Sequence, residues 1–109
     1  MFPKSVRVLR TAEFRKIYDN GVRFSTPLFA AFVLATEAGS GARLGLTVPR
    51  AIGGAVVRNR IKRRLREIFR LRRAAFGDRD IVLNPRKSLL TASGADIERA
   101  LGKVMERSK

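Results

Sequence analysis

The stretch over residues 53–70 constrains this protein more than any other part of its sequence. It reads Gly-Gly-Ala-Val-Val-Arg-Asn-Arg-Ile-Lys-Arg-Arg-Leu-Arg-Glu-Ile-Phe-Arg. On a helical wheel at about 100° per residue, its apolar residues fill one arc and its cations, with one asparagine, fill another. The apolar arc holds Val57, Ile61, Leu65, Ile68 and Phe69, and the cationic arc holds Asn59, Lys62, Arg63, Arg66, Arg70 and Arg73. The pattern predicts an amphipathic helix with an apolar seat on the core and a dense cationic face.

The charge on this predicted helix has a cost. Cations three or four residues apart, such as Lys62 and Arg66, repel each other by a few tenths of a kcal/mol. Glu67 is the only acid between Arg50 and Arg73, so little within the helix relieves that repulsion. A face kept cationic against this cost indicates a polyanionic partner. A solvated helix face without any partner is the alternative, although such faces usually mix the two signs of charge.

Composition narrows the possible classes of protein. The chain has 109 residues, enough for one domain, and its 45% of hydrophobic residues can fill a core. Its net charge of +15 is typical of a protein that binds nucleic acid. The absence of cysteine excludes disulfides and thiolate metal sites, and the absence of histidine removes the commonest general base. No apolar run is long enough to span a bilayer and the first residues lack the apolar region of a secretory signal, so we expect a cytoplasmic protein.

The N-terminal part of the chain predicts an irregular basic arm over residues 1–10 and a short helix over residues 12–19. Thr11 is the expected N-cap of this helix. Gly21, expected in a left-handed conformation, ends it.

Three large side chains, Phe14, Ile17 and Tyr18, share one face of that short helix. Their spacing alone favours a place in the core for all three. The alternative is that the two aromatic rings are partly exposed and stack on nucleobases.

Two strands are predicted next, over residues 28–36 and 42–49, on either side of a short loop with two glycines. The second strand alternates, with Leu44, Leu46 and Val48 on one face and Arg43, Gly45 and Thr47 on the other. The short glycine-containing loop favours an antiparallel pairing of the two strands.

The rest of the chain predicts a helix over residues 55–75, a buried strand over residues 80–84 and a last helix over residues 95–107. Gly77 and Pro85 mark the ends of the first helix and of the strand. The element order is therefore α-β-β-α-β-α, which predicts one α+β domain with helices packed on a small sheet.

The starts of these two helices carry further signals. Gly53 and Gly54 leave backbone N–H groups open near the start of the basic helix, which is a natural site for an anion. Ser93 and Asp96 form a capping box at the start of the last helix. The apolar stripe of the last helix consists of Ile97, Ala100, Leu101, Val104 and Met105.

Two motifs give the sequence a resemblance to a known family. Residues 44–50 read Leu-Gly-Leu-Thr-Val-Pro-Arg, and residues 52–63 read Ile-Gly-Gly-Ala-Val-Val-Arg-Asn-Arg-Ile-Lys-Arg. Residues 13–18, Glu-Phe-Arg-Lys-Ile-Tyr, fit the same pattern with the glycine that follows them. With the length, the charge and the element order, these motifs closely resemble the bacterial ribonuclease P protein subunit and its Arg-Asn-Arg signature. The resemblance covers essentially the whole chain.

The resemblance implies a fold and a function that the spacing of residues does not. The implied fold is a small four-stranded sheet packed with helices, with a left-handed βαβ crossover, similar to the second domain of a small-subunit ribosomal protein. The residue patterns alone predict three strands, and right-handed crossovers are the general rule. The implied function is that of the protein subunit of an endoribonuclease whose catalytic RNA removes the 5′ leader from precursor tRNA. In this role the protein broadens substrate recognition and lowers the magnesium requirement.

The resemblance also implies binding residues and partners. The basic helix would dock on the catalytic RNA, and a cleft between the first helix and the sheet would hold the single-stranded leader. The residues carried over by position are Arg58, Asn59, Arg60, Lys62, Arg63 and Arg66 for the catalytic RNA, and Phe14, Tyr18, Phe32 and Arg50 for the leader. The implied partners are the catalytic RNA and precursor tRNA, with the protein a monomer in a 1:1 complex with the RNA and without a membrane partner.

The sequence departs from the family pattern at two places. Family members often carry two adjacent cations after the second strand, whereas here Arg50 is followed by Ala51. The third strand often leads into an Ala-Arg pair, whereas residues 84–86 read Asn-Pro-Arg. Arg86 and Lys87 are the candidates to replace the altered contacts.

The acidic residues do not predict a catalytic site within the protein. Among nine carboxylates, only Asp78 and Asp80, and Asp96 and Glu98, are close in sequence, at a turn and at a helix start. A two-metal nuclease needs several carboxylates that converge on ions about 4 Å apart. We therefore expect no catalytic residue and no bound cofactor in the protein, and we expect Mg²⁺ to act through the RNA subunit.

Other function classes stay open at this point. A ribosomal or general RNA-binding protein without a processing role shares the charge and size, but it needs no leader cleft. A self-sufficient small ribonuclease needs an acid–base set that this histidine-free sequence does not supply. A membrane-active cationic protein is a weaker alternative, because the apolar faces are typical of core seats.

Overall fold

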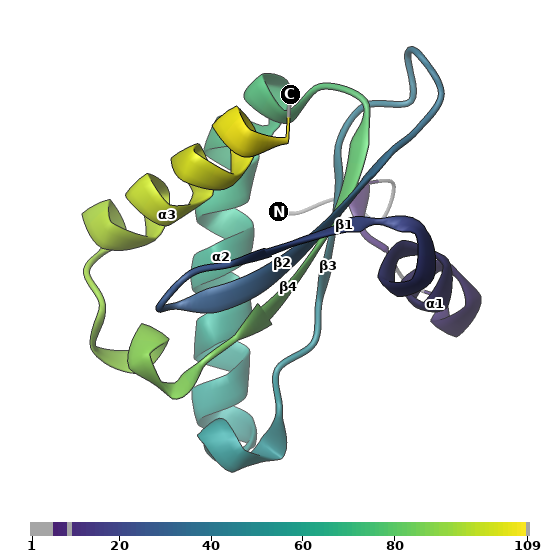
Figure 1. The fold of residues 1–109 in the computed structure, drawn as a ribbon. Helices are drawn as coiled ribbons and strands as arrows, with labels where there is room; N and C mark the ends of the chain where they lie inside the picture. Colours follow the sequence, from purple (N-terminus) through teal and green to yellow (C-terminus); the bar gives the residue numbers. More distant parts are fainter. Residues whose placement is uncertain (1–5, 9, 109) are drawn as a thin grey trace.

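The computed structural model describes residues 6–8 and 10–108, and it shows a mixed sheet with helices on both faces (Figure 1). The helices are α1 (Thr11–Asn20), α2 (Ala55–Phe76) and α3 (Gly94–Arg107). The strands are β1 (Val22–Ser25), β2 (Phe29–Ala35), β3 (Arg43–Leu46) and β4 (Arg79–Pro85). Short 3₁₀ turns, η2 (Arg50–Ile52) and η3 (Lys87–Thr91), precede α2 and α3. Helix α1 covers one face of the sheet, and α2 and α3 cover the other.

The strands lie in the order β1-β2-β4-β3. Strand β2 pairs antiparallel with both β1 and β4, and β4 pairs in parallel with β3. The predicted antiparallel pair of residues 28–36 and 42–49 is wrong, because β4 lies between these two segments. The predicted element order also lacked β1, a short strand at the edge of the sheet whose residues are mostly exposed. The four-stranded sheet that the resemblance implied is confirmed.

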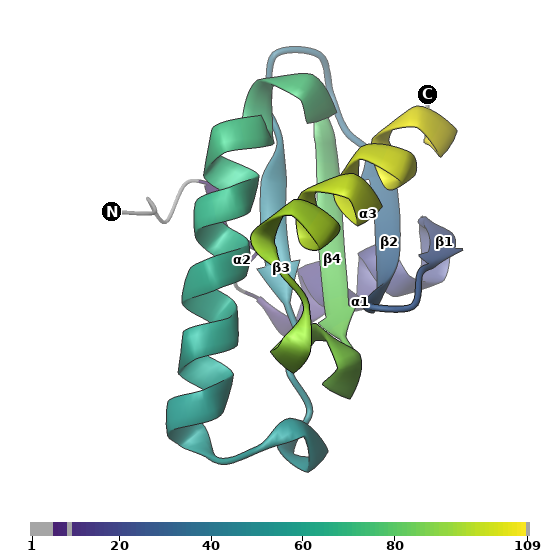
Figure 2. The ribbon, with the colours of Figure 1, turned by 90° about the vertical axis from the view of Figure 1, so that its left-hand side faces the viewer.

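The connection from β3 through α2 to β4 is left-handed. In Figure 2, β3 and β4 both run downward, β4 lies to the right of β3, and α2 crosses on the viewer's side of the sheet. A right-handed crossover with this strand direction would place β4 to the left. The resemblance implied this rare handedness, which the general rule for βαβ units opposes.

Hydrophobic side chains fill both sides of the sheet. The larger core lies between the sheet and helices α2 and α3, and Phe29, Phe69 and Leu101 are fully buried in it. The smaller core lies beneath α1 and is built around Ile17 and Val82. Strand β3 presents the two predicted faces, because Leu44 belongs to the larger core while the opposite face lies towards α1.

Some helix ends lie where the sequence predicts them, and others do not. The Ser93 Oγ accepts a hydrogen bond from the backbone N–H of Asp96 at 3.1 Å, which confirms the predicted cap of α3. The predicted Thr11 cap is wrong, because α1 begins one residue earlier and Arg10 is its N-cap. Gly21 has φ −78°, so the predicted left-handed conformation is also wrong. A side chain at this position would meet the Ile17 carbonyl oxygen at 2.5 Å, so close packing explains the glycine.

The predicted irregular arm over residues 1–10 falls partly outside the described residues. Within the described part, Val6 and Val8 are buried, and the Val8 N–H donates a hydrogen bond to the Leu44 carbonyl at 3.0 Å. This segment therefore lies along β3 and contributes to the core.

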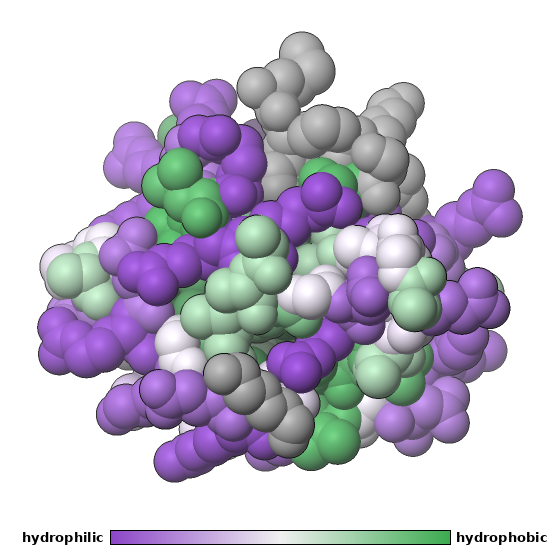
Figure 3. All heavy atoms as spheres, turned by 90° about the horizontal axis from the view of Figure 1, so that it is seen from above, coloured by the Kyte–Doolittle hydropathy of each residue, from purple (hydrophilic) through white to green (hydrophobic). Residues whose placement is uncertain are grey.

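Large hydrophobic side chains are scattered over the described surface. The exposed ones lie on β1, α2 and η3, and they are Val22, Val56, Leu71 and Leu90. Figure 3, seen from above, shows a mainly hydrophilic face on which hydrophobic areas are small. Among residues 6–8 and 10–108, no helix is long and apolar enough to cross a bilayer. The described surface therefore suits a charged partner better than an apolar one.

Candidate nucleic-acid interface

Helix α2 rests on the core through its predicted apolar arc. Ile61, Leu65, Ile68 and Phe69 are buried, and Val57 packs against them at the edge of the core. The seat fixes the roll of the helix and turns Arg60 and Arg63 towards solvent, whereas Arg64 donates to the Ala92 carbonyl at 2.6 Å. Local sequence periodicity and burial agree along the whole length of α2.

The six residues assigned to the catalytic RNA lie on the first half of α2. We call them the basic face, and they are Arg58, Asn59, Arg60, Lys62, Arg63 and Arg66. Asn59, Arg60 and Arg63 are exposed, and the other three are half-buried. Within the described part of the chain, no acid forms an ion pair with any member of the basic face. The Nε of Arg58 is buried without a hydrogen-bond acceptor among those residues.

Cations later in α2 are occupied within the protein. Arg70 pairs with Glu67 at 2.6 Å, and Arg72 pairs with Glu98 of α3 at 3.3 Å. The Nε of Arg73 donates to the Ala42 carbonyl at 2.8 Å. The cationic arc predicted from the helical wheel therefore included two residues, Arg70 and Arg73, that the fold engages internally.

Arg66 shows the electrostatic strain of the basic face. Burial lowers the pKa of the Arg66 guanidinium, and the positive charge of Arg7 lowers that pKa further. Arg7 lies before α1 and bridges to Leu44 of β3. No local pattern of residues predicts this proximity, because the fold brings the two arginines near each other. Two cations held close together favour an anion between or beside them.

Three aromatic rings meet between α1 and the sheet. The Tyr18 and Phe32 ring centroids are 4.8 Å apart with an edge-to-face angle of 85°, and those of Phe14 and Tyr18 are 6.5 Å apart. All three rings are half-buried, whereas Ile17 is 1% exposed. Of the two alternatives for this helix face, Ile17 takes the core position while Phe14 and Tyr18 keep exposed surface. The fold thus brings together Phe14, Tyr18 and Phe32, which the resemblance predicts to bind the leader.

Hydrogen bonds fix the Tyr18 ring over the sheet. Its hydroxyl donates to Oδ1 of Asn84 at 3.0 Å and lies 3.0 Å from the Thr47 Oγ1. These contacts join α1 to β4 and to the end of β3. Asn84 is one of the two departures from the family pattern, and the sequence alone gave no sign of this bond across 66 positions.

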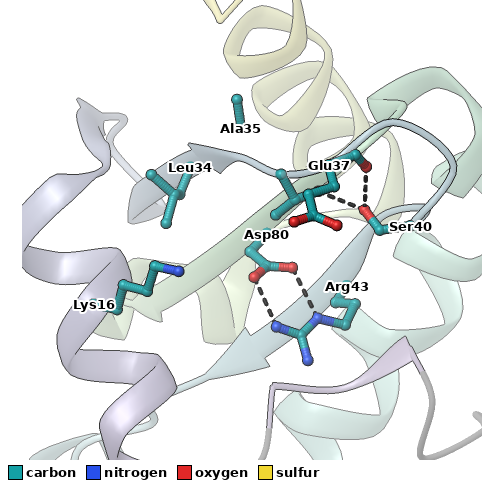
Figure 4. Close-up of a pocket in the computed structure, with 8 residues that line it drawn as sticks. Lys16, Leu34, Ala35, Glu37, Ser40, Arg43 and Asp80 are labelled. Atoms are coloured by element: carbon teal, nitrogen blue, oxygen red, sulfur yellow. Dashed lines mark hydrogen bonds and ion pairs between the residues drawn. The ribbon is translucent and has the colours of Figure 1, made fainter.

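A salt-bridge triad centred on Arg43 anchors α1 to the sheet. Its Nε and Nη2 bind the two carboxylate oxygens of Asp80 at 2.9 and 2.8 Å, and its Nη1 binds Glu13 Oε2 at 2.8 Å. The hydrogen bond to Asp80, followed by that to Glu13, raises the pKa of the Arg43 guanidinium against the effect of burial. The Arg43–Asp80 pair lines a depression of about 600 Å³. Figure 4 shows this pair together with Lys16 of α1, which also lines the depression.

Arg50 lies on η2, between the end of β3 and the start of α2, and it is exposed. Along the chain, it lies between β3, which borders the aromatic rings, and α2, which carries the basic face. No acid in the described ranges pairs with it. Ala51, which follows it, is exposed on the same turn.

Acidic residues of the described chain serve structural contacts. Glu13 and Asp80 hold Arg43, and Asp78 accepts hydrogen bonds from the backbone N–H groups of two glycines in the loop between β2 and β3. Those hydrogen bonds lower the pKa of Asp78. Across residues 6–8 and 10–108, no group of three acids lies close enough to hold a metal ion. The described side chains therefore offer binding surfaces without a converging set for hydrolysis.

Comparisons with known proteins give one consistent family. The family model described as Ribonuclease P matches residues 2–109. The chain is 38% identical to the ribonuclease P protein component of Desulforapulum autotrophicum over 107 residues, 97% of this chain and 91% of that protein. It is 48% identical to that of Maridesulfovibrio salexigens over 88 residues, 79% of this chain and 71% of that protein. The RNase P protein of Staphylococcus aureus superposes with a TM-score of 0.83 at 28% identity, with 97% of both chains covered.

Proposed function

The chain belongs to the ribonuclease P protein family, and on that premise we propose that its basic face binds the catalytic RNA while its aromatic cleft holds the 5′ leader of precursor tRNA. Family membership makes the chain the protein component of an endoribonuclease that processes tRNA, with the RNA subunit as its partner. The residues that make each contact, the precursor tRNA as a ligand and the 1:1 stoichiometry are parts of the proposal.

One observation carries the assignment of the basic face. The cations of the basic face have no acid partner in the described chain, whereas Arg70 and Arg72 on the same helix do. Burial, and after it the positive charge of Arg7, lowers the pKa of Arg66. Phosphate groups relieve such repulsion and release counterions, which supplies binding energy without sequence preference. A solvated helix face without a partner would more readily mix its charges.

The rings of Phe14, Tyr18 and Phe32 and the surface around them, which we call the aromatic cleft, support the second half of the proposal. Half-exposed rings of Phe14, Tyr18 and Phe32 can stack on unpaired bases, at roughly 1–3 kcal/mol per base and with tolerance for sequence. That tolerance suits leaders that differ from one precursor to another. Arg50 is exposed on η2, between β3 and α2. We propose that it contacts the RNA backbone where the leader approaches the catalytic RNA.

The chemistry of cleavage belongs to the RNA subunit in this proposal. Mg²⁺ ions held by that RNA would activate the attacking water, and the protein would lower the magnesium requirement by screening phosphate repulsion between the two RNAs. A general RNA-binding protein would share the basic face, but its affinity for RNA would not depend on the presence of a leader. We also propose that this function is exercised in the cytoplasm, where tRNA precursors are made.

Reconstituted cleavage tests the proposal. Precursor tRNA is incubated with a bacterial ribonuclease P RNA at low magnesium, with and without the protein, and the 5′ end of the product is mapped. We expect cleavage only when both components are present, and no cleavage by the protein alone. Arg58→Ala with Arg60→Ala should weaken assembly with the RNA while thermal unfolding stays cooperative. Loss of folding in this variant would assign both residues to the core.

Leader dependence tests the cleft separately. Phe14→Ala or Tyr18→Ala should weaken binding of precursor tRNA more than binding of mature tRNA, because only the precursor carries a leader. Arg99→Ala on α3 serves as a control, since its only described partner is Asp96 in the same helix. Equal losses for precursor and mature tRNA would place the two rings in the core and refute the leader assignment.

A further inference from the structure

We propose that Asn84 is a specificity-determining residue that reads the hydrogen-bonding edge of one leader nucleobase, an inference that rests on the function proposed above. Stacking on aromatic rings tolerates every base, so the cleft needs a polar side chain if it is to distinguish one base from another. Asn84 lies beside the rings, and its amide nitrogen donates no hydrogen bond within the described part of the protein.

Asn84 lies in a row of small and polar residues that crosses the sheet on the α1 side. Asn84 pairs with Ala30 of β2, and Ala30 pairs with Ser25 of β1. Thr47 extends the row, because its N–H donates to the carbonyl of Leu83, the neighbour of Asn84. Ala30 itself is buried, with 7% of its surface exposed, whereas Asn84 is half-buried and Thr47 and Ser25 are exposed. We call this row the cleft floor, and its Asn84 and Thr47 lie beside the Tyr18 ring.

The protons in this network can be assigned. The Tyr18 hydroxyl has a single proton, and it donates that proton to Oδ1 of Asn84. The Thr47 hydroxyl, 3.0 Å away, must therefore be the donor to the Tyr18 oxygen. Oδ1 of Asn84 is engaged, while the amide nitrogen donates to no described residue. It is absent from the buried polar atoms that lack a partner, and Asn84 is half-buried, so the amide is open to solvent.

A cation lies at the far end of the same floor. An Nη2 of Arg86 donates to the Ser25 Oγ at 2.7 Å, which holds the arginine side chain over β1. The guanidinium keeps other N–H groups for a phosphate. A leader nucleotide can therefore stack on one of the two rings, Tyr18 or Phe32, place an acceptor atom of its base at the Asn84 amide and direct its phosphate to Arg86. Carbonyl oxygens and ring nitrogens of nucleobases accept such hydrogen bonds.

The test measures affinity for precursors that carry each of the four bases at one leader position at a time. The holoenzyme is reconstituted with ribonuclease P RNA and compared for the wild type, Asn84→Ala, Asn84→Asp and Tyr18→Phe. The wild type should show a spread of about three- to ten-fold among the bases at one position, the effect of one hydrogen bond. Asn84→Ala should flatten that spread, while an abasic nucleotide at the same position should still weaken binding through lost stacking.

The other two variants test whether Asn84 contacts the base itself or only orients the Tyr18 ring. Asn84→Asp keeps the shape of the side chain and replaces the donor by an acceptor, so the order of preferred bases should change. Tyr18→Phe removes the bond between Tyr18 and Asn84 but leaves the amide in place, so the spread should survive. An unchanged spread in Asn84→Ala, or its loss in Tyr18→Phe, overturns the inference. A wild type that depends on leader length but on no base overturns it too, and a wild type indifferent to the leader overturns the proposed function itself.

Discussion

The salt dependence of RNA binding can be worked out from the basic face. Five of its six residues are cations, and none has an acid partner among the described residues. Each cation that neutralises a phosphate contributes about −0.7 to −0.9 to the slope of log affinity against log salt, so five give a slope of about −3.5 to −4.5. Arg60→Ala with Arg63→Ala removes two exposed cations and should reduce the slope to about −2 to −2.7.

The measurement is filter binding or fluorescence anisotropy with the catalytic RNA over a range of monovalent salt at fixed magnesium. A matched control replaces two exposed cations of α3, Arg99 and Lys103, and should leave the slope unchanged. Circular dichroism verifies that both double variants keep their fold. A wild-type slope near zero, or equal reductions in the two double variants, would refute the assignment of the basic face.

Three further predictions concern the scaffold that holds the cleft. Gly45→Ala should lower the free energy of unfolding by about 1–3 kcal/mol in a chemical denaturation series, because the new methyl group would lie 2.9 Å from the Phe14 ring. Asp80→Asn should cost about 2 kcal/mol in the same assay, less than the 3–5 kcal/mol of a fully buried pair, because Arg43 is 28% exposed; no loss would contradict the stabilising role assigned to the Arg43–Asp80 pair. The pKa of Asp78 is lowered in the folded state, so its stabilising effect is present above the ordinary value of 3.8 and is lost as the pH falls below it. Thermal unfolding of Asp78→Asn should therefore depend less on pH in that acidic range, and identical pH profiles would contradict the role of the loop hydrogen bonds.

The helices were predictable from the sequence because their information is local. The apolar arc of α2 repeats with the helical period, and the roll of the helix follows from it. The cap of α3 needs only Ser93 and a backbone N–H three residues away. In both cases the atoms that interact lie within one or two turns of each other.

The sheet order was not predictable in the same way. The loop between β2 and β3 is typical of a hairpin, yet β4, which follows only after α2, takes the place between them. Strand β1 escaped detection because an exposed edge strand carries no alternation of buried residues. Pairing of distant strands depends on the whole hydrophobic surface, and a short window of sequence does not contain it.

The candidate site likewise has features that local sequence predicts and features that depend on residues distant in the chain. The cations of the basic face follow from one segment, but which of them stay free depends on acids and carbonyls elsewhere, such as Glu98 and Ala42. Spacing could not separate Ile17 from Phe14 and Tyr18, because the way α1 rests on the sheet depends on partners distant in sequence, such as Arg43 and Asn84. The resemblance to a family, and not the spacing, led to the prediction that Phe14 and Tyr18 bind the leader.

Site-directed photo-crosslinking tests the central claim most directly. The sequence contains no cysteine, so a single introduced cysteine carries the crosslinker at one known place. In the complex with ribonuclease P RNA and precursor tRNA, a crosslinker at Arg63→Cys on the basic face should attach to the catalytic RNA. A crosslinker at Ser25→Cys on the cleft floor should attach to the leader. Attachment of the first to neither RNA, or of the second to the catalytic RNA and never to the leader, would contradict the account.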